Sequence, residues 1–223
     1  MLPVFNDPKL LDTALTHRSA LNEPSSGTSS ITSNERLEFL GDAVLELIVT
    51  RYLFEHHPDE PEGMLTAYRS ALVRTETLAE VAKELSLGSK LYLSKGEEAG
   101  GGRSNIGLLA DTFEALVGAV YLDQGLEKTS ELIKTYLLPK LEKIKSKRLY
   151  KDAKSLLQEI VQAKGLSTPE YLLIDEKGPD HEKEFKVSVT IDGKNYGVGA
   201  GSSKQIAQQA AAAQALQLFE KES

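Results

Sequence analysis

The spacing of apolar residues changes near residue 150, and no other feature of the sequence constrains the fold as strongly. Before this point, apolar residues recur at intervals of three and four, which is typical of amphipathic helices. After it, Phe185, Val187 and Val189 alternate with polar residues, as in a half-buried strand. The chain of 223 residues is also longer than the commonest single domain. The sequence therefore predicts a multidomain fold, with an all-α domain at residues 1–146 and a small α+β domain at residues 151–221.

The first domain is expected to consist of helices joined by short loops. Glycine, proline and serine are concentrated at residues 23–30, 57–63 and 100–102, which is typical of such loops. The helices are predicted at about residues 9–16, 35–55, 65–85, 105–122 and 126–144.

The second domain begins after the basic stretch at residues 143–148. An amphipathic helix is expected at residues 155–164, and Asp192-Gly193 is typical of a turn between two strands. Ser202 and Ser203 precede an alanine-rich helix at about residues 204–219. The order α-β-β-β-α indicates an antiparallel three-stranded sheet with both helices on one face.

Composition limits the classes of function. The net charge of −7 argues against a nucleic-acid partner, but clustered lysines can still bind phosphate, and carboxylates that hold cations would themselves make the total negative. The absence of cysteine excludes disulfides and thiolate metal sites. No apolar run approaches the roughly 20 residues of a membrane span, and Met1-Leu2-Pro3-Val4 does not resemble a secretory signal. We expect a cytoplasmic protein without a membrane partner.

Acidic residues stand together on the predicted helix at residues 35–55. Glu35, Glu38 and Asp42 fall on one stripe, because residues three and four apart are neighbours on a helix. The rest of this helix is apolar almost all round, so it should be largely buried. Like charges in such surroundings need a cation, protons or an opening to water.

A second acidic pair, Asp111 and Glu114, lies in an equally apolar helix. If the two helices pack together, four carboxylates would form one cluster. Oxygen ligands of this kind suit Mg²⁺ or Mn²⁺, and such a site can hydrolyse phosphodiesters. Two other interpretations are open: a solvated acidic face, or a di-iron bundle, although the latter usually adds a Glu-x-x-His pattern that the four histidines do not supply.

Residues 34–45, NERLEFLGDAVL, resemble the signature helix of the ribonuclease III family. Other segments similar to family features follow in the family's order, and residues 151–220 are similar to a double-stranded-RNA-binding domain. The resemblance thus covers nearly the whole chain. The other similar segments are THRS at residues 16–19, EG at 62–63, LVR at 72–74, GEE at 96–98 and LADTFEA at 109–115.

The resemblance implies a magnesium-dependent endonuclease that cuts double-stranded RNA, in which Mn²⁺ can substitute. Asp42 and Glu114 would be the catalytic pair, and Glu38 and Asp111 would join them in binding the metal. Glu114 would bind the metal directly, and Asp42 would help to position the metal and the attacking water. Three further acids match family positions with supporting roles, for which a plain surface carboxylate is the alternative: Glu35, Glu62 and Glu97.

The resemblance also implies a homodimer with two cleavage centres in one valley. Each strand would be cut once, leaving 5′-phosphate and 3′-hydroxyl ends with short 3′ overhangs, and ribosomal-RNA precursors and other transcripts would be processed. Phe39 matches a family position at the dimer contact, and an ordinary core phenylalanine is the alternative.

In the second domain, Gln158 and Glu159 match residues that reach the RNA minor groove in the family, and His181 lies in a segment that resembles the family's loop for the next minor groove. The resemblance implies that Lys204 begins the helix that docks on phosphates, with Gln208 one turn later. Recognition would be of A-form shape rather than base sequence. Relatives often carry two or three lysines at this helix start, but this chain has one. Residues 150–223 hold nine lysines and eleven carboxylates, a net charge of −2, so we expect RNA affinity to be weak or to depend strongly on salt.

Two other functions are open. The chain could be a non-catalytic member of the fold that serves in ribonucleoprotein assembly, although Asp42 and Glu114 are both present. It could also be an all-α metal phosphohydrolase acting on small nucleotides, although the second domain would then have no purpose.

Overall fold

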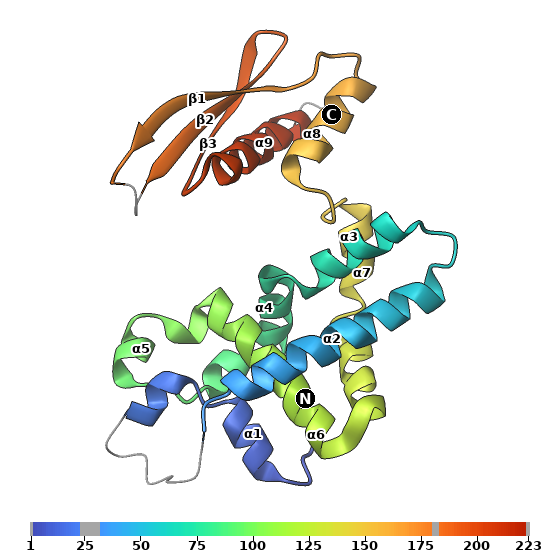
Figure 1. Cartoon of the computed structure of the whole chain (residues 1–223), viewed down its shortest axis with the longest axis vertical. Coiled ribbons are helices and arrows are strands. Elements are labelled where there is room, and N and C mark those ends of the chain that lie inside the picture. The colour runs from blue at the N-terminus through green and yellow to red at the C-terminus, as the bar shows by residue number, and fades with distance from the viewer. Residues whose placement is uncertain (1, 23–31, 180–182, 222–223) are drawn as a thin grey trace. The chain divides into compact units, whose positions relative to one another are not determined.

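The computed structural model describes residues 2–22, 32–179 and 183–221 and divides the chain into two compact units, Met1–Tyr150 and Lys151–Ser223. The described part of the first unit is helical, and the second has the order α-β-β-β-α (Figure 1). The predicted fold class is therefore confirmed. The expected loop at residues 23–30 lies outside the described residues. Among the described residues, no helix is long and apolar enough to cross a membrane.

The helices of the first unit are α1 (Pro8–Ala14), α2 (Glu35–His56), α3 (Glu62–Val73), α4 (Thr75–Glu84), α5 (Lys95–Ala99), α6 (Ile106–Tyr136) and α7 (Lys140–Ser146). A 3₁₀ turn, η1 (Arg18–Asn22), follows α1. The elements of the second unit are α8 (Ala153–Ala163), β1 (Glu170–Lys177), β2 (Glu184–Ile191), β3 (Lys194–Gly201) and α9 (Lys204–Lys221).

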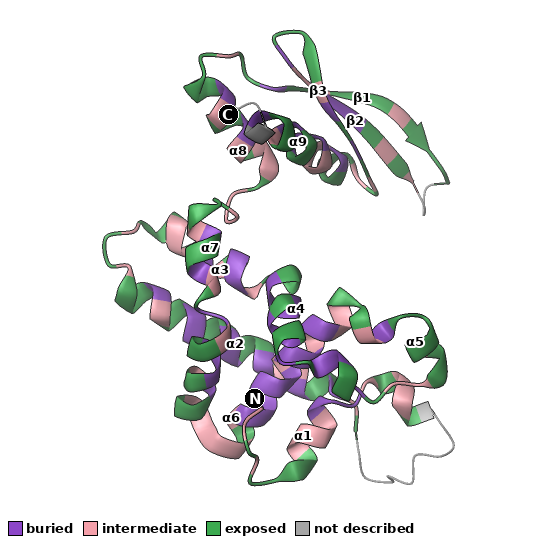
Figure 2. Ribbon diagram, turned by 180° about the vertical axis from the view of Figure 1, so that it is seen from behind, coloured by how far each residue is buried: buried purple, intermediate pink, exposed green. Residues whose placement is uncertain are grey.

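Helices α2 and α6 pack against each other at the centre of the first unit, where Figure 2 shows most of their buried residues. They approach so closely at Gly41 that a Cβ atom there would lie 1.8 Å from the carbonyl oxygen of Glu114. A Cβ atom at Gly118 would lie 2.3 Å from the carbonyl oxygen of Leu37. Backbone therefore meets backbone at this crossing, and the two glycines permit it. The large fully buried side chains of this unit include Leu45, Leu53, Leu72, Leu109, Phe113 and Leu116.

Two predicted helices are divided in the structure, so both predictions were wrong as continuous helices. The segment at 65–85 breaks at Arg74, whose extended backbone (φ −68°, ψ 152°) ends α3 and begins α4. The segment at 126–144 breaks before Pro139, which has no backbone N–H to continue a helix. The separation expected between residues 122 and 126 falls at Gly125, a non-helical residue (φ 81°, ψ −177°) within α6.

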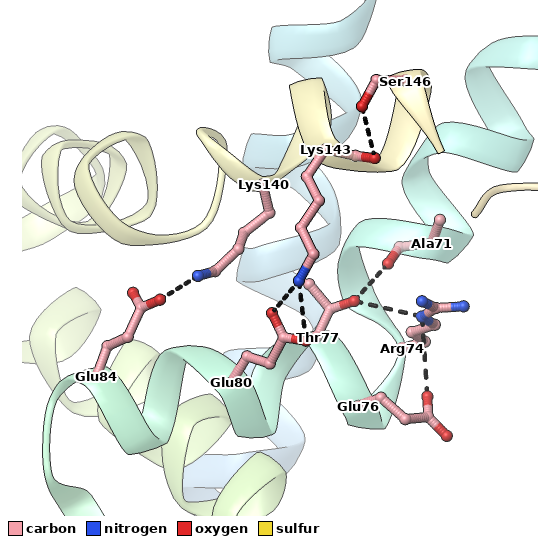
Figure 3. A network of polar contacts seen from close by, with 9 residues as sticks. All are labelled: Ala71, Arg74, Glu76, Thr77, Glu80, Glu84, Lys140, Lys143 and Ser146. Atoms are coloured by element: carbon pink, nitrogen blue, oxygen red, sulfur yellow. Dashed lines mark hydrogen bonds and ion pairs between the residues drawn. The ribbon is translucent and has the colours of Figure 1, made fainter. Parts of the chain in front are cut away.

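Helix α7 is fastened to α4 by polar side chains (Figure 3). Lys140 pairs with Glu84, and the ammonium nitrogen of Lys143 lies 3.3 Å from a carboxylate oxygen of Glu80. Arg74 donates to the backbone oxygen of Leu149 at 3.3 Å. These contacts hold the residues after α7 against the helical core of their own unit.

The second unit is an antiparallel sheet in the order β1-β2-β3 with α8 and α9 packed on one face. Val189 and Ile191 of β2 contact the apolar faces of both helices. Helix α9 faces the sheet with alanines, and a Cβ atom at Gly199 of β3 would lie 2.2 Å from the backbone nitrogen of Ala211. Small residues thus let α9 lie close on the sheet.

Candidate functional site

Three carboxylates from two helices converge beside the α2–α6 crossing. Glu38 belongs to the first turns of α2, and Asp111 and Glu114 lie three residues apart on α6. One carboxylate oxygen from each lies within 4.8 Å of those of the other two. The crossing at Gly41 places these side chains together, because Gly41 contacts the backbone of Glu114 itself.

Burial and mutual repulsion disfavour the charged forms of these acids. Burial, followed by the charges of Asp42, Asp111 and Glu38, raises the pKa of Glu114 to about 8. Burial and neighbouring acids, with Asp111 first, also raise the pKa of Glu38. The pKa of Asp111 is raised chiefly by burial, against an opposing effect of His17. Such a cluster is stabilised by a divalent cation, and its oxygen-only donors suit Mg²⁺ or Mn²⁺.

Asp42 lies one turn beyond Glu38 on α2, and it is exposed. Its carboxylate is not one of the three that meet within 4.8 Å. It is nevertheless close enough for its charge to raise the pKa of both Glu38 and Glu114. Asp42 therefore stands on the solvent side of the three-carboxylate cluster.

A hollow of about 380 Å³ opens beside the cluster and connects it to the segment that precedes α2. Its lining includes Glu38 and Asp111, together with His17, Arg18 and Glu35. Glu35 accepts a hydrogen bond from Ser33 at 2.7 Å and lies 3.6 Å from Arg18. His17 and Arg18 were part of a family-like segment, but sequence reasoning gave neither a role. Their proximity to the acids depends on contacts between distant parts of the chain.

The other two supporting acids differ in position. Glu97 lines a neighbouring hollow of about 570 Å³ that shares His17 and Arg18 with the first. Glu62 begins α3, beyond the far end of α2, where its carboxylate accepts a hydrogen bond from Thr66 at 3.0 Å. His56 lies 18 positions after Glu38 on α2, which is about 27 Å at 1.5 Å per residue. Glu62 is therefore not brought to the cluster within one chain.

Phe39 is 82% exposed, so the interpretation as a core phenylalanine is wrong. Leu47 and Phe54 on the same helix are 57% and 72% exposed. The three residues are eight and seven positions apart, so they fall on one side of a helix with 3.6 residues per turn. Helix α2 therefore presents an exposed apolar stripe, formed by Phe39, Leu47 and Phe54.

The RNA-binding residues suggested by the resemblance are partly described. Gln158 and Glu159 are exposed on α8, and Lys151 holds Glu159 through an ion pair of 2.5 Å. Lys204 begins α9, and Gln208 accepts a hydrogen bond of 2.6 Å from Lys154. His181 lies outside the described residues. Sequence reasoning did not single out Lys154, because the approach of α8 to α9 is a tertiary contact.

Both units match known protein families. Residues 7–141 match the family described as "Ribonuclease-III-like". Residues 153–218 match the "Double-stranded RNA binding motif".

Similar proteins span nearly the whole chain. The chain is 48% identical to Ribonuclease 3 of Chloroflexus aggregans over 95% of its own length and 91% of that protein. It is 47% identical to Ribonuclease 3 of Roseiflexus sp. over 97% and 91% of the two chains. Among solved structures, the nuclease domain of ribonuclease III from Campylobacter jejuni covers 61% of this chain and 92% of its own, with 39% identity and a TM-score of 0.55. That nuclease domain shows structural flexibility in a region involved in dimer formation.

Proposed function

Because the chain belongs to the ribonuclease III family, we propose that it is an endoribonuclease that hydrolyses phosphodiester bonds of double-stranded RNA. The observation that supports this most directly is the convergence of Glu38, Asp111 and Glu114 beside Asp42. Their number and donor type fit a site for Mg²⁺, with Mn²⁺ able to substitute. The second unit, which matches a double-stranded-RNA-binding motif, would hold the substrate.

The three-carboxylate cluster would hold the cation. When bound, the cation supplies charge neutralisation at the phosphate and lowers the pKa of a coordinated water. Glu114 must lose its proton to serve as a ligand, and its raised pKa of about 8 means that it retains this proton near neutral pH without a cation. Proton release by Glu114 and cation binding are therefore coupled.

Asp42 would act from the solvent side of the cluster. Its exposed carboxylate can accept a hydrogen bond from the attacking water and orient it toward the phosphorus. The charge of Asp42 raises the pKa of both Glu38 and Glu114, and this proximity to the proposed ligands supports the assignment. The supporting acids Glu35 and Glu97 line the adjoining hollows and would position cations or RNA there.

The exposed apolar stripe of α2 supports a homodimer. In a twofold contact between two copies of α2, a residue that precedes the axis in one copy faces the residue that follows the axis by the same distance in the other copy. Phe39 and Glu55 lie eight residues, or about 12 Å, on either side of Leu47. A twofold axis at Leu47 would thus place Phe39 of one copy at the hollow of about 540 Å³ that the other copy forms between α2 and α6. Leu47, Tyr52, Glu55 and Leu126 are among the residues that line this hollow.

The same symmetry gives Glu62 a role. An antiparallel pair of α2 helices would bring the start of α3 in one copy toward Glu38 of the other, so Glu62 would support the partner's cluster. Two clusters acting on opposite strands would produce duplexes with 5′-phosphate and 3′-hydroxyl ends and short 3′ overhangs. The family resemblance suggests ribosomal-RNA precursors, among other transcripts, as substrates.

The test is cleavage of a long, fully paired RNA by the purified protein, with Mg²⁺, with Mn²⁺ and with chelator. Single-stranded RNA of the same sequence is the control. We expect metal-dependent cutting of the duplex alone, with end mapping that reveals 3′ overhangs. Duplex binding without cutting in either metal would favour the non-catalytic assembly protein. Rapid hydrolysis of small nucleotides without duplex binding would favour the phosphohydrolase.

A further inference from the structure

The start of α9 carries little positive charge for a helix that is to dock on RNA. This inference rests on the proposed binding of double-stranded RNA. Within residues 204–209, Lys204 is the only lysine, and Gln208 occupies the same face one turn later. One ammonium group neutralises one phosphate, whereas affinity for a duplex rises with each phosphate that is neutralised. Helix α9 alone therefore offers a single contact of this kind.

A lysine from another helix fills the position at Gln208. Helices α8 and α9 lie side by side (Figure 1), and the ammonium nitrogen of Lys154 donates to the side-chain oxygen of Gln208 at 2.6 Å. The backbone nitrogen of Lys154 also donates to the side chain of Gln209 at 3.3 Å. The ammonium group lies 4.8 Å from the ring centre of Tyr171, which stabilises the cation. The two contacts to α9 set the register of Lys154 against that helix.

No acid among the described residues pairs with Lys154. Among the described residues, Lys154 forms no ion pair within 4.0 Å, whereas Lys151 is paired with Glu159. The nearby carboxylate of Asp152 accepts hydrogen bonds from Gln209 and Ser155. An ammonium group has three donors, and the bond to Gln208 uses one, so two can reach phosphate oxygens.

We propose that Lys154 is a phosphate-binding residue that supplies, from α8, the second positive charge of the α9 docking surface. Lys204 and the ammonium of Lys154 would then contact phosphates about one helical turn, 5.4 Å, apart. Gln158 lies four residues after Lys154 on α8 and so shares its face. The RNA-contacting surface therefore runs continuously from Gln158 through Lys154 to Lys204.

The first experiment measures binding of the full chain to a fluorescent RNA duplex with chelator present, over a series of salt concentrations. The variant is Lys154→Gln. Its matched control is Lys186→Gln, which removes the same charge from an exposed position on β2, next to the buried Val187. We expect Lys154→Gln to weaken binding about fivefold at low salt and to make the slope of log affinity against log salt shallower by about one. Lys186→Gln should change neither quantity.

The second experiment separates a phosphate contact from a structural role. Gln208→Lys in the Lys154→Gln background returns an ammonium to the same place from α9, and it should restore both the affinity and the salt slope. Gln208→Lys in the wild-type chain should raise the affinity for RNA much less. The ammonium group of Lys154 already occupies that position, and the effects of neighbouring substitutions are not additive.

Equal behaviour of Lys154→Gln and Lys186→Gln would overturn the proposal, and so would weakened binding that Gln208→Lys does not restore. In the latter case, Lys154 would act only by supporting α8 against α9. A wild-type chain that binds no duplex at any salt concentration would instead remove the proposed function, and this inference with it. This result differs from failure of the Lys154 proposal alone, because the wild-type chain and all variants would then fail to bind the duplex.

Discussion

At the scale of single residues, the shape of the acidic cluster makes Glu114 the group whose removal is most informative. One of its carboxylate oxygens lies within 4.8 Å of those of Glu38 and Asp111, and its carboxyl group is partly withdrawn from water. Replacing it by glutamine keeps the shape and removes the charge that a cation needs. The residues that we propose to contact RNA lie in the other unit and are not altered.

We predict that Glu114→Gln lowers the cleavage rate by about a hundredfold or more, because loss even of an outer-shell partner of a metal commonly costs 10–100-fold. Duplex binding should remain unchanged. Single-turnover cleavage and binding assays on the same preparation measure the two quantities, with Glu142→Gln, an exposed acid on α7, as the control. Normal turnover by Glu114→Gln would contradict the assignment of this carboxylate.

A second prediction concerns pH and stability without metal. The pKa of Glu114 rises from its ordinary value of 4.5 to about 8 on folding. Between these values the folded chain binds more protons than the unfolded chain, so the free energy of unfolding decreases as pH rises. The raised pKa values of Glu38 and Asp111 act in the same direction.

In chelator, the Tm of the wild-type chain should therefore fall between pH 5 and pH 8 more steeply than that of Glu114→Gln. Addition of Mg²⁺ at pH 8 should raise the wild-type Tm more than the variant's. Thermal unfolding followed by circular dichroism tests this, again with Glu142→Gln beside the wild type. Parallel pH profiles for Glu114→Gln and the wild type would show that Glu114 does not carry the raised pKa.

Residue positions were predictable from the sequence to the extent that they depended on helical spacing. The i,i+3 pair Asp111 and Glu114 and the stripe that holds Glu38 follow directly from the 3.6-residue repeat. The neighbours His17 and Lys154 do not, because His17 approaches Asp111 across 94 positions and Lys154 approaches Gln208 across 54. Contacts of that kind depend on tertiary packing, which periodicity does not report.

At the scale of elements, the α2–α6 crossing determines where the acids stand. A methyl group at position 41 would overlap the backbone of Glu114 and force the helices apart. Overpacking of this kind commonly costs about 1–3 kcal/mol, and the rigid backbone on the other side leaves little room to relax. We predict that Gly41→Ala lowers stability by about 3 kcal/mol and reduces cleavage even where the chain remains folded.

Urea unfolding measures the stability change, and cleavage is assayed at a temperature where the variant is folded. The matched control is Gly63→Ala in the first turn of α3, where an added Cβ atom meets nothing within 4 Å. Alanine there should be neutral or stabilising by up to about 1 kcal/mol. Equal stability of the two variants would show that the crossing tolerates a side chain.

Element boundaries were predicted less well than element types. The break at Arg74 has no proline or glycine beside it, and its carbonyl oxygen accepts from Thr77 and Leu78 to begin α4. Such a corner depends on packing on both sides. The break before Pro139 did carry a local signal, because proline interrupts the helical hydrogen-bond ladder. The strands and the turn at Asp192-Gly193 were predictable because alternation and turn chemistry are local.

At the scale of the whole molecule, the exposed apolar stripe of α2 predicts self-association. Phe39→Glu should convert the proposed dimer to a monomer, because it places a charge where the partner's hollow would take an aromatic ring. Analytical ultracentrifugation measures the mass, and cleavage of both strands should fall with dimer content. Leu172→Glu is the control, since Leu172 is 54% exposed on β1 of the other unit. A dimeric Phe39→Glu variant would place the subunit contact elsewhere.

The glycines at the α2–α6 crossing also determine which amino-acid substitutions the protein tolerates. Every substitution of glycine adds at least one carbon atom to the residue. At positions 41 and 118 that atom would overlap the backbone of the opposite helix, so we expect every substitution there to be harmful. In a library selected for cleavage, both positions should be as depleted of substitutions as those of the acids, although neither glycine has a side chain that could bind a cation. The amount of each variant protein in the cell distinguishes the two groups. Variants of the acids should accumulate as folded, inactive protein, whereas the glycine variants should be degraded.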